Sequence, residues 1–117
     1  MTPAEQVHLR ILRIVEEEPQ ISQRQLAERL GASLGKTNYL IKALLDKGYI
    51  KAGNFLRAED KLKYAYLLTP DGIRAKLRLT RNYLARKEQE YVAMKVEIEG
   101  MRAELATQDD RGKQPEN

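Results

Sequence analysis

Cysteine is absent from this 117-residue chain, and no stretch of it is apolar over the length of a membrane span. The lack of cysteine excludes disulfides and cysteine-based redox sensing. The lack of a long apolar stretch excludes a membrane-spanning helix. The first residues show no basic segment followed by an apolar run, so no secretion signal is expected. We therefore expect a cytoplasmic protein without a membrane partner.

Patterns for catalysis and metal binding are also missing. His8 is the only histidine, and no cysteine or second histidine could share a metal ion with it. The acids at residues 16–18 end a predicted helix, which is more typical of a solvated helix end than of acid–base machinery. Residues 31–37 resemble a phosphate-binding loop, but their glycines are one residue too close and a helix precedes them. We expect neither an enzyme nor a cofactor.

The charge balance permits a nucleic-acid partner without establishing one. The formal net charge is +4, and charged residues make up 32% of the chain against 42% hydrophobic residues. These proportions are typical of a soluble folded domain. A basic balance of this size also fits a weak contact with a membrane surface, so the distribution of the charge has to decide.

Three helices are predicted before residue 48, each with an apolar stripe at spacings of three and four residues. Ser22 and Ser33 can cap the second and third helices, and Gly31 and Gly48 can end them. The tight glycine turn between these two helices indicates a helix-turn-helix. The predicted helices span residues 3–18, 23–30 and 34–47.

The third helix carries uncharged and basic polar groups off its apolar stripe, which is the arrangement of a DNA-recognition helix. Asn38 could pair with adenine, and Lys36 or Lys42 with guanine or phosphate. Gly35 would let the backbone approach DNA closely. The alternative is an ordinary surface helix in a small helical domain. The predicted DNA-binding residues of this helix are Ser33, Gly35, Lys36, Asn38, Tyr39 and Lys42.

Residues 49–68 change to an alternating period, which predicts two strands over 49–56 and 63–68 around a charged hairpin tip at 57–61. Gly53-Asn54 interrupts the first of these strands. A helix-turn-helix followed by a hairpin is a winged helix. The predicted fold class is therefore mainly α with a small β-hairpin (α+β), with residues 1–69 as the DNA-binding domain. Arg57, Lys61 and Lys63 could reach a phosphate or the minor groove, and the alternative is a solvated turn of mixed charge.

A long helix is predicted from Pro70 to about residue 105, with Thr69 as its cap. Apolar residues follow a heptad pattern along it, interrupted by Thr80 and Lys87. A core of about 65 residues cannot cover a helix about 50 Å long, so we expect a homodimer. Residues 70–106 are thus the predicted dimerisation helix, and residues 107–117 a disordered tail. The predicted interface comprises Ile73, Leu77, Leu84, Tyr91, Met94, Ile98, Met101 and Leu105.

The orientation of the two long helices stays undecided at this stage. Charged residues from Arg74 to Lys87 are all basic and acids dominate from Glu88, which favours an antiparallel pair. The positions flanking the seam favour a parallel pair instead. There Glu90 would meet Lys95 and Glu97 would meet Arg102, although Lys76 would meet Arg81. Either dimer would present two recognition helices to double-stranded DNA, and we expect a palindromic site.

The segments 26–33 (LAERLGAS) and 44–50 (LLDKGYI) resemble the MarR family of bacterial winged-helix regulators. Residues 53–55 and 61–73 resemble more specifically the short subgroup described as EPS-associated. This resemblance implies a transcription factor tied to exopolysaccharide gene clusters. Ordinary members have an extra N-terminal helix and dimerise through two C-terminal helices, whereas this chain has one. Their effector pocket lies between the DNA-binding and dimer regions, so no small-molecule effector is carried over.

Two functions from different classes follow from these patterns. The first is a homodimeric, sequence-specific DNA-binding transcriptional regulator. The second is a protein-interaction module that uses the winged helix as a scaffold and the long helix to recruit a partner, without specific DNA binding. A steep dependence of duplex DNA binding on salt would distinguish the first from the second.

Overall fold

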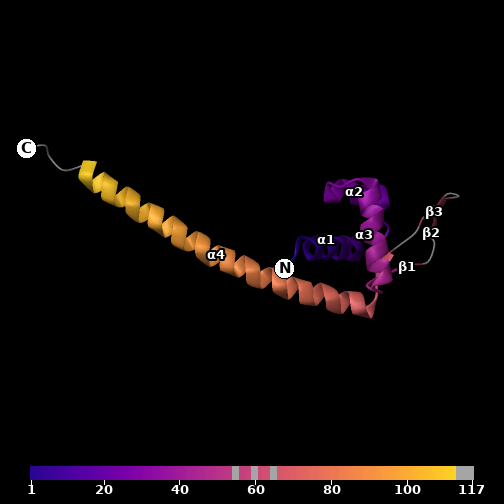
Figure 1. The fold of residues 1–117 in the computed structure, drawn as a ribbon. Coiled ribbons are helices and arrows are strands. Elements are labelled where there is room, and N and C mark those ends of the chain that lie inside the picture. Colours follow the sequence, from indigo (N-terminus) through magenta and orange to yellow (C-terminus); the bar gives the residue numbers. More distant parts are fainter. Residues whose placement is uncertain (54–55, 59–60, 64–65, 113–117) are drawn as a thin grey trace, which may run out of the picture. The chain divides into compact units, whose positions relative to one another are not determined.

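A computed structural model describes residues 1–53, 56–58, 61–63 and 66–112, with side chains described outside 54–65 and 110–117. The chain divides into two compact units, residues 1–83 and the residues from Leu84 onward. Three helices, two pairs of short strands and one long helix follow one another along the chain (Figure 1). The elements are α1 Pro3–Glu17, α2 Gln23–Leu30, α3 Leu34–Asp46, β1 Ile50–Ala52, β2 Leu56–Ala58, β3 Lys61–Lys63, β4 Tyr66–Leu68 and α4 Pro70–Gly112.

Side-chain caps set the starts of the first three helices. Thr2 accepts a hydrogen bond from the Glu5 N–H at 3.1 Å, with Pro3 in the first turn. Ser22 and Gln25 form a reciprocal capping box, in which each side chain accepts from the backbone N–H of the other residue. The predicted bounds of α2 are confirmed, and those of α1 and α3 agree to within one residue.

One apolar core holds the first unit together. Among the described elements, helix α1 contributes the largest number of buried side chains, because its apolar residues recur on one face. Ile21, in the connection between α1 and α2, is also buried but belongs to no strand. The largest fully buried side chains are Ile11, Leu12, Val15, Leu26, Thr37, Ile41, Leu44 and Ile50.

The acidic end of α1 is tied to neighbouring elements rather than merely solvated. Glu16 lies 2.6 Å from the Lys76 Nζ on α4, and Glu18 lies 2.7 Å from the Arg29 Nη1 on α2. Both pairs are partly exposed, so each contributes little to the free energy of unfolding. Their main effect is to fix the position of the end of α1 relative to α2 and the start of α4.

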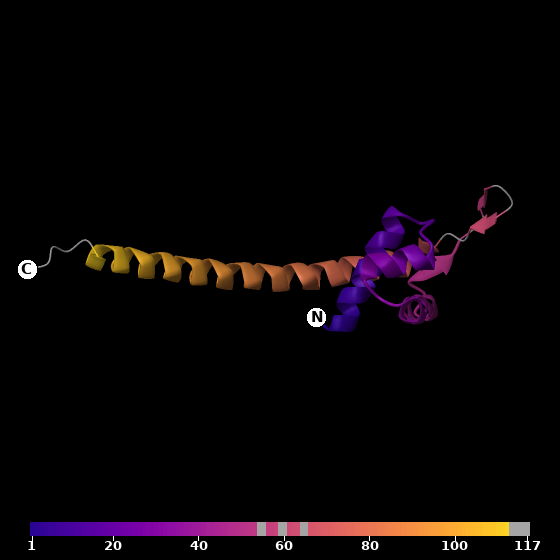
Figure 2. The same ribbon diagram turned by 90° about the horizontal axis from the view of Figure 1, so that it is seen from above.

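Within the described residues, the strands form two antiparallel pairs. Ile50 pairs with Leu68 and Ala52 with Tyr66, which joins β1 to β4. Leu56 pairs with Lys63 and Ala58 with Lys61, which joins β2 to β3 beyond the first pair (Figure 2). The predicted strand over 49–56 thus corresponds to β1 and the start of β2, which lie on either side of the predicted interruption at Gly53-Asn54. The predicted tip at 57–61 is too wide, because residues 57, 58 and 61 lie in strands.

Helix α4 begins as predicted, after Thr69, and continues to Gly112. Residues 107–112, predicted to be disordered, are helical, and the Thr107 hydroxyl donates to the Ala103 carbonyl at 3.0 Å. This stretch has no proline before residue 115, and each residue added to an existing helix gains a backbone hydrogen bond. No helix within the described residues is both long and apolar enough to cross a bilayer.

Candidate nucleic-acid interface

Helix α3 has two opposite faces of contrasting character. Thr37, Leu40, Ile41 and Leu44 recur at spacings of three and four and are buried. Gly35, Asn38, Tyr39 and Lys42 repeat the same spacing two residues earlier and are exposed. One face therefore fixes the helix in the core while the other is presented to solvent.

The turn before α3 fixes where this exposed face begins. Gly31 has a φ of 66°, in the left-handed region that favours glycine, and ends α2. The N–H groups of Gly31 and Ala32 donate to the carbonyls of Glu28 and Ala27. Ser33 then caps α3 by accepting from the Lys36 N–H at 3.1 Å. Two helices joined in this way form a helix-turn-helix.

All six residues predicted to bind DNA on α3 are exposed and lie together over its first turns. The Tyr39 side chain is 73% exposed. Lys36 and Lys42 form no ion pair, and the Asn38 amide forms no hydrogen bond, with any residue in the described part of the chain. These donors and acceptors are free to contact a nucleic acid.

The exposed face of α3 also has a single sign of charge. Lys36 and Lys42 carry its charge, and the helix contains no acid before Asp46 in its last turn. Lys47, just after the helix, lies with its Nζ 5.9 Å from the centre of the Tyr49 ring. A basic helix face with free amide and hydroxyl groups suits phosphates and base edges together.

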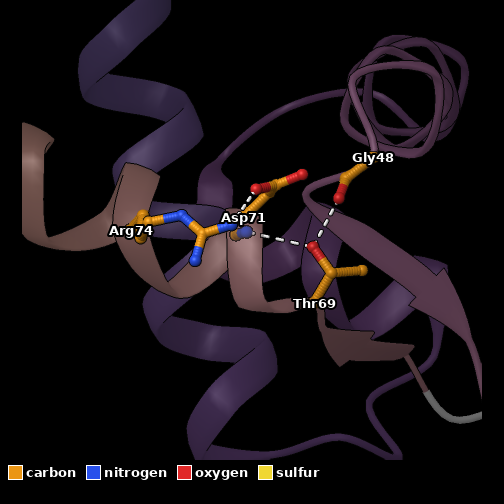
Figure 3. Close-up of polar contacts among 5 residues, drawn as sticks. Gly48, Thr69, Asp71 and Arg74 are labelled. Atoms are coloured by element: carbon orange, nitrogen blue, oxygen red, sulfur yellow. Dashed lines mark hydrogen bonds and ion pairs between the residues drawn. The ribbon is translucent and has the colours of Figure 1, made fainter.

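Contacts at the far end of α3 join it to the start of α4 (Figure 3). The Thr69 hydroxyl donates to the Gly48 carbonyl and accepts from the Gly72 N–H, the latter at 3.0 Å. The Thr69 N–H donates to the Tyr49 carbonyl at 3.0 Å. A Cβ at residue 72 would lie only 2.8 Å from the Tyr49 carbonyl carbon, so glycine permits this close packing. The position of α3 is thus set at both ends.

The basic residues predicted in the wing are only partly placed. Arg57 lies in β2 opposite Leu62, and Lys61 and Lys63 lie in β3. Their backbones are described, but their side chains lie outside the described residues. The geometry brings the six α3 residues together on one face and leaves the contribution of these three as a prediction.

Leu34 is an exposed residue that the sequence pattern did not single out. It is the first residue of α3 and its side chain is 48% exposed. Its spacing from Thr37 and Ile41 matches the apolar stripe, so periodicity alone gives no signal of exposure. Apolar side chains at this end of a recognition helix can contact thymine methyl groups.

His8 and the acids offer no alternative chemistry. Burial lowers the pKa of His8, nearby Lys47 lowers it further, and Glu5 opposes both effects. The imidazole therefore favours its neutral form at neutral pH. Among the residues that the structure describes, no group of His, Cys, Asp or Glu could hold a metal ion.

The family comparison agrees with the geometry of α2 and α3. Residues 5–51 match the family model described as winged helix-turn-helix DNA-binding. These residues form a winged helix-turn-helix domain. The match ends in β1, so it does not include strands β2 to β4 of the wing or helix α4. No curated protein sequence matches the chain.

Solved structures share the fold of the winged domain and the helix that follows it. One is the Staphylococcus aureus MepR–DNA complex, 23% identical, with a TM-score of 0.61 over 97% of this chain and 79% of that one. The Mycobacterium tuberculosis MarR family protein Rv2887, bound to salicylic acid, is 19% identical with a TM-score of 0.60 over 90% and 77%. Streptococcus pneumoniae FabT in complex with DNA is 19% identical, with a TM-score of 0.55 over 88% and 74%. The chain therefore has the fold of MarR-family regulators.

Proposed function

We propose that this chain is a sequence-specific, double-stranded DNA-binding transcriptional regulator that acts as a homodimer. The observation that carries the proposal is the exposed face of α3, where Lys36, Asn38 and Lys42 lie together without partners in the described chain. Free polar groups on a helix fixed by its opposite face suit direct readout of the major groove.

The residues divide by the kind of DNA contact that they can make. Asn38 presents an amide, which can bond in bidentate fashion to adenine. Lys36 and Lys42 can donate to guanine or to phosphate, and Tyr39 can donate its hydroxyl to phosphate. Ser33 has its oxygen occupied as a cap, so its contribution is chiefly to fix the start of α3.

Relatives by fold support this assignment. MepR and FabT are both described in complexes with DNA. The resemblance of residues 61–73 to EPS-associated regulators extends the proposal to exopolysaccharide genes and to the bacterial cytoplasm. Selection of bound fragments from genomic DNA would identify the operators and test this extension directly.

The homodimer is supported by the apolar seam on α4. Its residues are exposed in the single chain, from Ile98 at 37% to Tyr91 at 66%. A repeating apolar face of this length favours burial against a second helix. Two copies would then supply the two recognition helices that a palindromic site requires.

The DNA-binding assignment is tested with Lys36→Ala and Asn38→Ala, measured by fluorescence anisotropy on a selected operator over a series of salt concentrations. Asn38→Ala should weaken specific binding by about 1–3 kcal/mol and relax discrimination at one base. Lys36→Ala should also reduce the salt slope by about one if Lys36 contacts phosphate. Gln89→Ala removes an exposed amide from α4 and should change nothing.

Two results would contradict the assignment. Unchanged operator affinity in both α3 variants, with folding intact by circular dichroism, would remove these residues from the interface. Absence of salt-dependent duplex binding in the unmodified chain would favour the interaction module that uses the winged helix only as a scaffold.

A further inference from the structure

The second unit of the chain consists of α4 from Leu84 onward, and one of its faces is apolar and uncovered. Side chains on this face form a groove lined by Tyr91, Met94, Lys95, Ile98, Glu99 and Arg102. Tyr91, Met94, Lys95 and Ile98 have the spacing i, i+3, i+4 and i+7. This is the set of four residues that receives one side chain of a second helix in a coiled coil.

Charged residues beside this groove lack partners in their own chain. Lys95, Glu97 and Arg102 form no ion pair within residues 84–109, whose side chains are described. Glu90 differs, because its carboxylate contacts the Arg86 Nε at 3.2 Å and the Lys87 Nζ at 3.0 Å. Unpaired charges that flank an apolar seam set the choice and the direction of the partner helix.

We propose that residues 84–105 of α4 pair with the same residues of a second copy in a parallel, in-register, two-stranded coiled coil. The inference rests on the homodimer of the proposed function and assigns its direction. In a parallel pair each flanking residue faces the residue five positions later in the other helix. Glu90 then meets Lys95 of the second copy, and Glu97 meets Arg102, and symmetry doubles both contacts.

An antiparallel pair would bring like charges together over the same residues. In an antiparallel pair, the g positions of one helix face the g positions of the other. Glu90, Glu97 and Glu104 all occupy g positions. Aligning Tyr91 with Met94 of the second copy, for example, would place Glu90 opposite Glu97 twice on one flank, and only Glu88 opposite Lys95 on the other would offset this repulsion. The charges at these positions therefore favour the parallel direction.

The basic start of α4 does not argue for the antiparallel pair, because its charges are engaged within the first unit. Lys76 pairs with Glu16 on α1, and Arg74 pairs with Asp71. Arg78 donates to the Tyr49 hydroxyl at 3.4 Å. A parallel coiled coil that began before Leu84 would bring Lys76 close to Arg81 of the second copy. The pairing of Lys76 with Glu16 removes this repulsion. The coiled coil thus begins near Leu84.

The direction is tested by disulfide trapping, for which the cysteine-free chain gives a clean background. Leu105→Cys, equilibrated in a glutathione redox buffer, should form a homodisulfide in full-length protein, because residue 105 meets its own copy in a parallel pair. Val96→Cys, on the outward face, is the matched control and should stay reduced, because the two sulfurs are out of reach. Sedimentation equilibrium of the unmodified chain should give the mass of a dimer.

Mixed disulfides between two different cysteine variants would reveal an antiparallel pair. Leu84→Cys chains mixed with Met94→Cys or Met101→Cys chains should give no mixed disulfide, because these residues lie about 15–25 Å apart along parallel helices. A mixed disulfide together with an uncrosslinked Leu105→Cys variant would overturn the parallel direction and leave the homodimer standing. A monomeric mass would overturn both, whereas operator binding is measured separately and decides the DNA-binding assignment.

A charge swap tests the proposed contacts themselves. Arg102→Glu should raise the dimer dissociation constant about tenfold, because two attractions become two repulsions. Adding Glu97→Lys to the same chain should restore the original value, since each parallel contact again joins opposite charges. Val96→Lys instead adds a positive charge on the outward face and should not restore it. Failure of the double variant to recover, with Leu105→Cys uncrosslinked, would exclude the proposed register.

Discussion

Glycine at residue 35 meets no requirement of the fold that the described residues show. It lies on the exposed face in the first turn of α3, and no atom lies within 4 Å of the position that a Cβ would occupy. Its backbone angle is helical, so no left-handed conformation requires glycine there. Glycine inside a helix costs about 1 kcal/mol relative to alanine. The absence of any folding benefit points to an external surface that approaches the backbone closely.

Gly35→Ala should therefore change folding and binding in opposite directions. The free energy of unfolding should rise by up to about 1 kcal/mol, because alanine favours the helix and meets no obstacle. Operator affinity should fall about tenfold, because a methyl group would occupy the surface nearest to DNA. Urea denaturation and fluorescence anisotropy on the same preparation measure the two effects. Equal or tighter operator binding would show that DNA does not approach this backbone.

At the scale of elements, the junction between α3 and α4 connects recognition to dimerisation. Thr69 bonds to the carbonyl of Gly48 and to the N–H of Gly72. Because Tyr49 packs directly on Gly72, the turn that follows α3 and the first turn of α4 lie in backbone contact. This contact fixes the end of the recognition helix that is opposite to its DNA-binding turns.

Gly72→Ala should destabilise the protein although alanine is the better helix former. The added methyl would collide with the backbone of Tyr49, which cannot rotate away as a side chain can. We expect a loss of about 1–3 kcal/mol in the free energy of unfolding, measured by urea denaturation. Gly100→Ala is the control, since nothing lies within 4 Å of its added methyl and it should gain about 1 kcal/mol. Equal effects of the two substitutions would refute the packing argument.

The element scale also shows where the sequence was and was not sufficient. Helix α2 could be predicted to the residue because Ser22 and Gly31 mark both ends with local chemistry. The six α3 site residues followed from the same local periodicity. The buried face of α4 could not be predicted in this way, because Ala75 and Leu79 lie outside the heptad seam. They are buried only because the core of the first unit lies against them. In the wing, Gly53-Asn54 marked the interruption between β1 and β2, whereas the alternation of residues 49–68 did not give the bounds of the outer pair β2 and β3.

At the scale of the whole molecule, the proposed function assigns a different part of DNA binding to each of the two units. The first unit has a core of its own and carries α3, whereas the second has an exposed seam and no described buried residue. A single winged domain with a few cationic contacts binds DNA weakly at physiological salt. Linking two such domains makes the second contact intramolecular, which can strengthen binding by about 10²–10⁴-fold. In the proposed dimer, α4 would therefore raise operator affinity without touching DNA.

Disruption of the apolar seam on α4 should accordingly abolish dimerisation and leave the binding of one winged domain to a half-site intact. Ile98→Asp places a charge in the centre of the apolar face and should yield a monomer by sedimentation equilibrium. Affinity for a palindromic operator should fall by at least about a hundredfold, whereas affinity for a single half-site should be unchanged, because α3 is untouched. Val96→Asp adds the same charge to the outward face and should retain the dimer and full operator affinity. A monomer that keeps full affinity for the palindrome would mean that one winged domain suffices, and the link between the seam and DNA recognition would be lost.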